Sequence, residues 1–304
     1  MIDSLTTLLT GIVDYAGLFP PAALDMNAAV RAYANYWHDP SHFMLGRFVV
    51  PVARLPEFDE ASQSMLPRGD SSTTTPPWLL SALVGPDVDA DIQQALKFNC
   101  RHWSGSELGH AVIDSLELKA SSSAEISAAM SRMPKQFRPF FEIPTDPDPA
   151  PLIVELKRAG GCAKIRTGGV TQNDFPPSAH VARFLKRCQE QAVPFKATAG
   201  LHHPLRSQYA LTYEPHAPVA TMYGYLNLFI AAAFAHTGAD EFFLDRILEE
   251  TSANTFVFHD TGLTYGGETL TSTVLDDTRH TFALSFGSCS FREPVDDLVA
   301  LTLA

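Results

Sequence analysis

Short apolar runs alternate along the chain with longer segments whose apolar residues recur at helical spacing. The apolar runs begin at residues 11, 46, 78, 111, 137, 162, 194 and 282. Strands that alternate with helices in this way are typical of a parallel sheet, and eight such strands close into a barrel. The pattern therefore predicts an α/β fold, a (β/α)8 barrel that occupies residues 1–304 as a single domain.

The segments between these runs have the apolar spacing of amphipathic helices. Helices are predicted at residues 26–37, 57–65, 90–98, 123–133 and 151–160. A Ser and Glu capping pattern opens the fourth of these helices, and a glycine pair ends the fifth. The segment 67–77, PRGDSSTTTPP, is polar and rich in turn-forming residues, so we expect an exposed, mobile loop there.

The spacing is regular except at residues 201–280, where a much longer segment separates the last two strands. It contains a predicted long apolar helix at 219–236, a second helix at 240–251 and a hairpin at 255–274. Loops that follow the strands of a barrel form its active-site face. We therefore expect residues 201–280 to be an insertion after strand seven that covers the site like a lid.

The sixth and seventh runs form a strand–helix–strand unit at residues 161–203 that carries one lysine in each strand. Lys164 and Lys196 are separated by about one βαβ repeat, so neighbouring parallel strands would hold their amines side by side. Burial and like charge both favour the neutral, nucleophilic amine. We therefore expect a lowered lysine pKa and the reaction chemistry here, although a lone lysine would more simply lay its stem over the barrel rim.

Three acidic residues lie towards the ends of apolar runs, and they are candidate counter-charges for buried cations. They are Asp14 in the first run, Glu117 in the fourth and Glu142 in the fifth. Since side chains alternate along a strand, Lys164 and Arg166 share one face. The sequence predicts that these groups meet near the mouth of the barrel; the alternative is that each charge reaches solvent at its own strand end.

The eighth run leads into the sequence FGSCSFREP at residues 286–294. Its proline suits a first helical turn, and the backbone N–H groups before it would point at a bound anion. Barrels often bind phosphate after the last two strands. Gly287, Ser288 and Ser290 are therefore candidate anion ligands; the alternative is an ordinary helix cap made by Ser290 or Glu293.

The segments KIRTGG, PFKATAG and FGSCS resemble, in order, the motifs K-T-S-T-G, F-K-x-A-G-G and F-G-A-S-S of the last three strands in the deoxyribose-phosphate aldolase family. The opening VDYAGLFPPAALDMNAAV is similar to that family's I-D-H-T-L-L-x-P-x-A-T strand. DSLELK resembles its D-E-V-D-V-V strand, and PFFEIP its V-I-I-E-T strand. The resemblance runs through most of the barrel, and the lysine pair is its most specific part.

The resemblance implies a class I aldolase, a lyase that acts on a small carbonyl substrate through a Schiff base without a cofactor. Lys164 would form the imine and Lys196 would lower its pKa, while Glu117 and Asp14 would handle protons. The substrate would carry a phosphate or carboxylate. The residues that would seat this anionic group are Gly200, Gly287 and Ser288.

Three residues depart from the family pattern, and we expect them to decide the substrate. Arg166 replaces a small hydroxyl residue after the first lysine, and His202 and His203 follow the second glycine turn. A guanidinium in the mouth favours a carboxylate. We therefore expect Arg166, together with Glu142 and His203, to contact a substrate other than deoxyribose 5-phosphate.

Composition limits the choice of partner. The formal net charge is −12 and no basic block occurs, which argues against nucleic acid and against an anionic membrane. The N-terminus lacks a signal-peptide pattern, and the apolar run at 222–235 is too short to cross a bilayer. The four cysteines form no CxxC pair. We expect a cytoplasmic protein with reduced thiols and a small-molecule partner, and the long apolar helix is compatible with a homo-oligomer contact.

Two other functions stay open at this point. In the first, His203, Glu142 and Asp260 would bind a catalytic metal in a metal-dependent lyase or hydrolase. In the second, the barrel would bind a ligand without catalysis and keep the lysines as structural charges. The paired lysines favour the aldolase hypothesis, for which no metal is expected.

Overall fold

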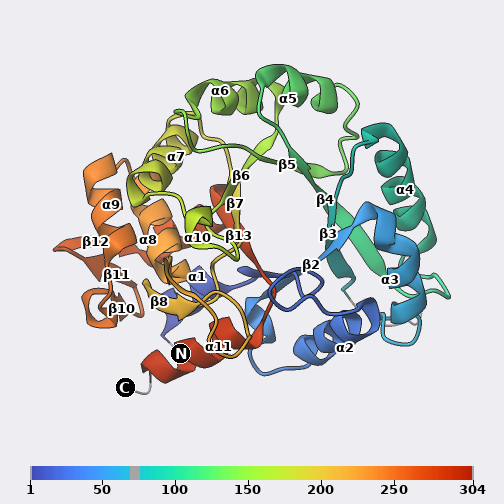
Figure 1. Ribbon diagram of the computed structural model, residues 1–304, viewed down its shortest axis with the longest axis horizontal. Coiled ribbons are helices and arrows are strands. Elements are labelled where there is room, and N and C mark those ends of the chain that lie inside the picture. Colours follow the sequence, from blue (N-terminus) through green and yellow to red (C-terminus); the bar gives the residue numbers. More distant parts are fainter. Residues whose placement is uncertain (1, 69–75, 303–304) are drawn as a thin grey trace.

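Eight parallel strands close into a barrel in the computed structural model, which describes residues 2–68 and 76–302 (Figure 1). The predicted (β/α)8 barrel is confirmed, and every predicted strand start lies within two residues of an observed one. In order around the barrel, the strands are β1 (Val13–Tyr15), β2 (Leu45–Pro51), β3 (Trp78–Leu83), β4 (Ala111–Lys119), β5 (Arg138–Glu142), β6 (Cys162–Arg166), β7 (Phe195–Thr198) and β13 (Ala283–Ser288), which pairs with β1 to close the ring.

Side chains alternate along each strand between the helix layer and the barrel interior, as the period of two requires. In β7, Phe195 and Ala197 belong to the hydrophobic core, whereas Lys196 lines a cavity inside the barrel. In β6, Ile165 is core and Lys164 lines the same cavity. The apolar contacts outside the barrel stabilise the fold, so the inward positions are available for charged side chains.

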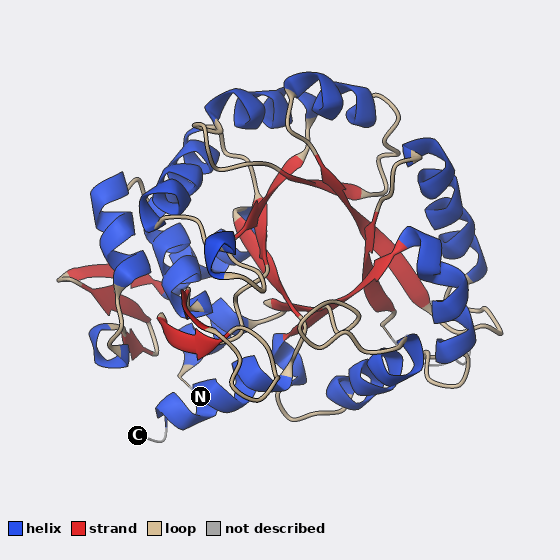
Figure 2. Cartoon of the chain, in the orientation of Figure 1, coloured by secondary structure: helices blue, strands red, loops and turns tan. Residues whose placement is uncertain are grey.

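Helices surround the strands (Figure 2). They are α1 (Asp3–Leu9), α2 (Met26–Trp37), α3 (Leu55–Ser62), α4 (Val88–Arg101), α5 (Ser123–Met130), α6 (Ala150–Ala159), α7 (Ser178–Glu190), α8 (Tyr225–His236), α9 (Glu241–Glu249), α10 (Ser272–Thr281) and α11 (Arg292–Thr302). The capping box of α5 is present between Ser122 and Glu125, and Gly160 ends α6 in the left-handed conformation. The sequence pattern predicted neither α1 nor α10, whose first three residues fell within the predicted hairpin at 255–274.

Single-turn 3-10 helices occur at His42–Met44, Val52–Arg54, Gln172–Asp174 and Ala253–Thr255. The segment predicted as a mobile polar loop, 67–77, falls largely outside the described residues. No helix in the described ranges is long and apolar enough to cross a membrane. The long apolar run instead forms most of α8, which is buried over Tyr225 to Ala235 as predicted.

The segment 201–280 begins with a hairpin of β8 (Ser207–Ala210) and β9 (Val219–Met222). The prediction that the apolar helix begins at residue 219 is therefore wrong. Residues 219–222 alternate between exposed and buried positions and pair with β8, and the helix begins only after Gly224. Apolar residues are frequent on both sides of Gly224. The sequence therefore did not show where the two-residue period of a strand changes to the 3.6-residue period of a helix.

The predicted hairpin at 255–274 is present within a three-stranded antiparallel sheet of β10 (Val257–His259), β11 (Gly262–Tyr265) and β12 (Glu268–Thr271). This sheet lies at the outer edge of the molecule, beside α9 and beyond α8 (Figure 1). Helix α8 packs on β13 and takes the usual place of a barrel helix between the last two strands. Most of segment 201–280 is thus outside the barrel rather than over its mouth.

Candidate active site

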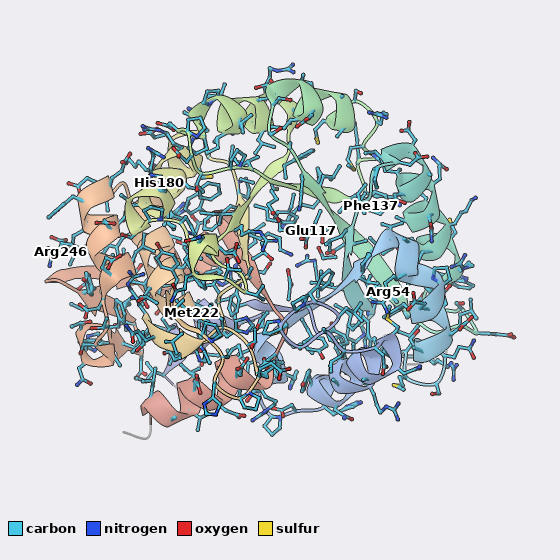
Figure 3. All side chains as sticks on the ribbon, viewed as in Figure 1. Arg54, Glu117, Phe137, His180, Met222 and Arg246 are labelled. Carbon is cyan, nitrogen blue, oxygen red and sulfur yellow. The ribbon has the colours of Figure 1, made fainter. Side chains whose placement is uncertain are left out.

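A cavity of about 840 Å³ occupies the barrel at the carboxyl ends of the strands. This is the face on which barrel enzymes carry their active sites. The residues predicted for the site that line this cavity are Glu117, Glu142, Lys164, Arg166, Lys196, Gly200 and Gly287. Figure 3 shows Glu117 inside the ring of strands, whereas the labelled Arg54, His180 and Arg246 lie outside it.

The two lysines are direct neighbours, because Lys164 pairs in register with Lys196 across β6 and β7. Both ammonium groups bind Glu117: Lys164 Nζ lies 2.8 Å from Oε2, and Lys196 Nζ lies 2.6 Å from Oε1. One carboxylate therefore bridges the pair. The predicted juxtaposition of the lysines is present, and Glu117 fixes both amines on the floor of the cavity.

Each lysine also has a second carboxylate of its own. Lys196 Nζ is 2.6 Å from Asp14 Oδ2, and Lys164 Nζ is 2.9 Å from Glu142 Oε2. The Lys196 side chain is 1% exposed and that of Lys164 is 7% exposed. Asp14 itself is fully buried and does not line the cavity. Lys164 is therefore the more accessible amine, and Asp14 anchors Lys196 from behind.

Three buried hydroxyl groups complete the hydrogen bonding of the carboxylates. Ser81 donates to Glu117 Oε1 at 2.6 Å, and Ser285 donates to Asp14 Oδ2 at 2.7 Å. Ser115 in turn donates to Ser81 at 2.9 Å. These serines were not predicted, although alternation along β3, β4 and β13 places them on inward positions. Small polar residues at such positions are the signal that could have found them.

The expected lowered pKa of Lys164 is wrong for this structure. Burial alone would lower the pKa, but the carboxylates of Glu117 and Glu142 outweigh burial and raise it above the ordinary value. For Glu117 the effects have the opposite sign. Burial alone would raise its pKa, but Lys164 and Lys196 outweigh burial and hold the pKa well below the usual range. The sequence showed two amines and could not show that three carboxylates bind them, so Lys164 rests here as an ammonium ion.

Arg166 lies at the rim of the cavity, with its side chain 48% exposed. Its Nε donates to Glu142 Oε1 at 3.2 Å and its Nη1 to the Gly168 carbonyl at 3.4 Å, while Nη2 has no hydrogen bond among the described residues. Glu142, predicted as a substrate contact, is thus an anion held between Lys164 and Arg166. A carboxylate in this position repels an anionic substrate, so the substrate's anionic group would go to the guanidinium instead.

Gly168 and Gly200 bring the loops after β6 and β7 into close contact. A Cβ atom on Gly200 would lie 2.8 Å from the Gly168 Cα and 2.9 Å from the Phe175 ring. Gly200 also has a φ of +73°, which favours glycine. These contacts hold together the loops that follow β6 and β7, the strands that carry Lys164 and Lys196.

We expect Gly200→Ala to lower the free energy of unfolding by about 1–3 kcal/mol through backbone strain and this steric conflict. Gly267→Ala is the matched control, because Gly267 also has a positive φ, +86°, but a Cβ there meets no atom within 4 Å. Urea unfolding of both variants measures the effect. An equal loss in the two variants would show that the contact with Gly168 contributes nothing.

His202 forms a buried polar cluster at one side of the cavity. Its Nδ1 is 3.3 Å from Glu293 Oε2, 3.3 Å from Ser288 Oγ and 3.9 Å from Cys289 Sγ. Tyr213, from the turn between β8 and β9, donates to Glu293 at 2.7 Å. Burial alone would lower the pKa of His202, but Cys289 and Glu293 outweigh it and raise the pKa to about 9. His202 is therefore an imidazolium ion at neutral pH.

This raised pKa gives a pH dependence of stability with a definite sign. The contribution of His202 is fully present below about pH 6.5, its pKa in the unfolded chain, and is lost as the pH rises through about 9. We expect the free energy of unfolding to fall over that interval by on the order of 1–3 kcal/mol. Urea unfolding at several pH values measures it, and His202→Gln should flatten the dependence. An unchanged slope in the variant would contradict the assignment.

Several predicted residues do not reach the cavity. His203 binds Asp297 Oδ2 through Nδ1 at 2.5 Å and stacks on Tyr209. Ser290 caps α11 by accepting from the Glu293 backbone N–H at 3.1 Å, as the alternative interpretation had it. Ser288 is buried against His202. Of the three predicted anion ligands in this turn, only Gly287 lines the cavity.

The three residues of the metal hypothesis do not come together. Asp260 lies in the turn between β10 and β11, His203 is bound to Asp297, and Glu142 is held by two cations. In the described ranges, no group of three or more His, Cys, Asp or Glu residues is placed to hold a metal ion. The metal-dependent alternative therefore loses its proposed ligands.

Segment 201–280, expected to cover the site like a lid, contributes little to the lining of the cavity. Within segment 201–280 only His202 lines the cavity, and Tyr213 reaches Glu293 beside it. The segment thus forms one side wall. Lys119 and Cys289 are among the cavity-lining residues that were not predicted. Lys119 follows Glu117 by two positions in β4, so strand alternation was the signal for it.

Comparison with protein-family models, with curated proteins and with solved structures gives no match to this chain. The barrel is established by its own strand order and pairing. What the cavity can do chemically follows from the side chains that line it.

Proposed function

We propose that this chain is a lyase of the class I aldolase type, which cleaves or forms a carbon–carbon bond through an imine on Lys164. The observation that carries the proposal is a lysine on the cavity floor in direct contact with two carboxylates, Glu117 and Glu142, beside a second lysine. An imine mechanism needs a nucleophilic amine and adjacent groups that move protons. The order of motifs resembling the deoxyribose-phosphate aldolase family supports the same chemistry.

Lys164 must first lose a proton, since only the neutral amine attacks a carbonyl. Glu142 is the better acceptor. Glu117 is stabilised as an anion by both lysines, whereas Glu142 contacts one lysine and the more exposed Arg166. Burial penalises the charged form of both Lys164 and Glu142, so transfer of the proton between them removes two buried charges at once.

The amine then adds to the carbonyl carbon and water leaves, which gives a protonated imine where the ammonium ion was. Its positive charge lies beside Glu117, so the site that stabilises the ammonium also stabilises the iminium. In the cleavage direction, a carboxylate takes the proton of the substrate hydroxyl, the adjacent carbon–carbon bond breaks, and its electron pair moves to the iminium to form an enamine. Protonation of the enamine carbon and hydrolysis return the amine.

Lys196 and Asp14 act through Glu117 in this proposal. Lys196 lies between Asp14 and Glu117 and under the Phe140 ring, at 5.4 Å from its centroid. It holds Glu117 in place and favours its ionised form. We therefore assign Lys196 and Asp14 as positioning residues, which differs from the direct proton-handling role expected for Asp14.

Reductive trapping tests the proposal. The purified chain would be incubated with pyruvate or with small aldehydes, treated with sodium borohydride, and weighed by intact-mass spectrometry. We expect a mass gain equal to the carbonyl compound minus one oxygen atom, which is the loss of water followed by the gain of two hydrogens, at one site per chain. A folded chain that gives no adduct with any 2-oxo acid or aldehyde would contradict the imine mechanism.

A further inference from the structure

The wall of the cavity is divided into two contiguous halves of opposite character. Around β5, β6, β7 and β13 the lining is polar and includes Glu142, Lys164, Arg166, Lys196 and His202. Around β1, β2 and β3 it is apolar. The apolar half is formed by Phe19, Pro20, Pro21, Val84, Pro86 and Val88, from the loops after β1 and β3 and the start of α4.

The apolar half is reachable by a ligand. Phe19, Val84 and Val88 are only partly buried, and each also packs against the hydrophobic core. In Figure 1 the loop after β1 curls over the lower edge of the barrel opening. These side chains therefore present a firm apolar surface to the cavity.

The size of the cavity also indicates a ligand that extends into the apolar half. At about 840 Å³ it lies near the upper end of the range of roughly 300–1,000 Å³ found for sites that enclose drug-sized ligands. A substrate that occupied only the lysines and Arg166 would leave the apolar half in contact with water. Burying an apolar group there contributes binding free energy in proportion to the area removed from water.

Resting on the proposed function, we propose that the substrate is an amphipathic 2-oxo acid whose carbonyl lies between a carboxylate and an apolar body, either an aromatic ring or a branched alkyl group. The carboxylate binds the unengaged Arg166 Nη2, the carbonyl carbon meets Lys164, and the apolar body lies against Phe19, Val84 and Val88. Sugar phosphates do not match this division, because they have no apolar body.

The corresponding reaction is the cleavage of a 4-hydroxy-2-oxo acid. Lys164 forms the iminium at C2 with loss of water. The C4 hydroxyl gives its proton to a carboxylate, the C3–C4 bond breaks, and its electron pair forms the enamine of pyruvate. C4 leaves as an aldehyde that carries the apolar group. Protonation at C3 and hydrolysis release pyruvate, so every atom and electron pair is accounted for without an oxidant or a reductant.

Binding of an unreactive analogue tests the apolar subsite separately from the imine. Isothermal titration would compare 4-phenylbutanoate with butanoate, neither of which has a carbonyl that lysine can attack. We expect the phenyl compound to bind about tenfold more tightly or better. Val84→Ser and Val88→Ser should each remove at least half of that advantage. Val154→Ser is the matched control, because Val154 is 50% exposed on α6 and does not line the cavity.

Activity supplies the second measurement. We expect kcat/KM for 4-hydroxy-2-oxo-4-phenylbutanoate to exceed that for 4-hydroxy-2-oxopentanoate by about tenfold or more. Equal binding of 4-phenylbutanoate and butanoate, or an advantage unaffected by both valine variants, would overturn the apolar subsite even if trapping at Lys164 succeeds. The opposite outcome is also distinguishable. If 4-phenylbutanoate binds more tightly than butanoate and the valine variants remove this advantage, but no imine is trapped, the subsite is supported and the aldolase mechanism is overturned.

Discussion

Replacing Lys164 by methionine is expected to abolish borohydride trapping and to lower the rate of carbon–carbon cleavage by about a thousandfold or more, as removal of a covalent nucleophile does. The chain should stay folded. Glu117 would keep its contact with Lys196, and Glu142 its contact with Arg166. Methionine has nearly the shape of the lysine stem, so the packing of the cavity floor is preserved. Intact-mass measurement after trapping and a cleavage assay with circular dichroism as a folding check measure the outcome.

Lys119 offers the matched control for this substitution. It also lines the cavity, but its side chain is exposed at the end of β4. Lys119→Met should therefore keep the trapped adduct and change the cleavage rate far less than Lys164→Met does. The account would be contradicted by a Lys164→Met chain that is still trapped at one site, or by loss of the adduct in the Lys119 variant alone.

The second large effect concerns stability. Glu117→Leu is expected to lower the free energy of unfolding by about 3–5 kcal/mol, because it leaves two buried ammonium groups without their shared carboxylate. Ser81 would also lose its acceptor. Urea unfolding followed by circular dichroism measures the loss.

A double-mutant cycle separates the charge effect from a simple packing defect. In Glu117→Leu/Lys164→Met the remaining groups balance, with Lys196 on Asp14 and Glu142 on Arg166. We expect the double variant to be more stable than Glu117→Leu alone by about 1–3 kcal/mol. Additive losses from the two substitutions would mean that the Glu117 contact with Lys164 contributes little to the fold.

The barrel was predictable because its strands follow a simple rule. Each outward position must be apolar to pack on helices, and each run ends where the loops of the active-site face begin. The inward positions obey no such rule, yet alternation alone places Lys164, Arg166 and Lys196 on them. The same reasoning would have added Lys119 to the lining of the cavity, and would have placed Ser81 and Ser285 beside the buried carboxylates.

The pairing of charges could not be predicted from the sequence. Whether Lys164 is neutral or charged depends on the contact of 2.8 Å with Glu117 and of 2.9 Å with Glu142, and such distances depend on how three separate strands align in the ring. His203 illustrates the same limit. It was expected, with His202 and Arg166, to decide the substrate, but it binds Asp297 and does not line the cavity.

Peptide mapping of the reduced adduct tests the central claim most directly. The chain would be trapped with [¹³C]pyruvate and borohydride, digested, and sequenced by tandem mass spectrometry. The account predicts the label on Lys164, the more accessible of the two neighbouring amines, with none on Lys196, which is enclosed by Asp14 and Glu117. A label on Lys196, or on Lys119 in place of Lys164, would contradict it.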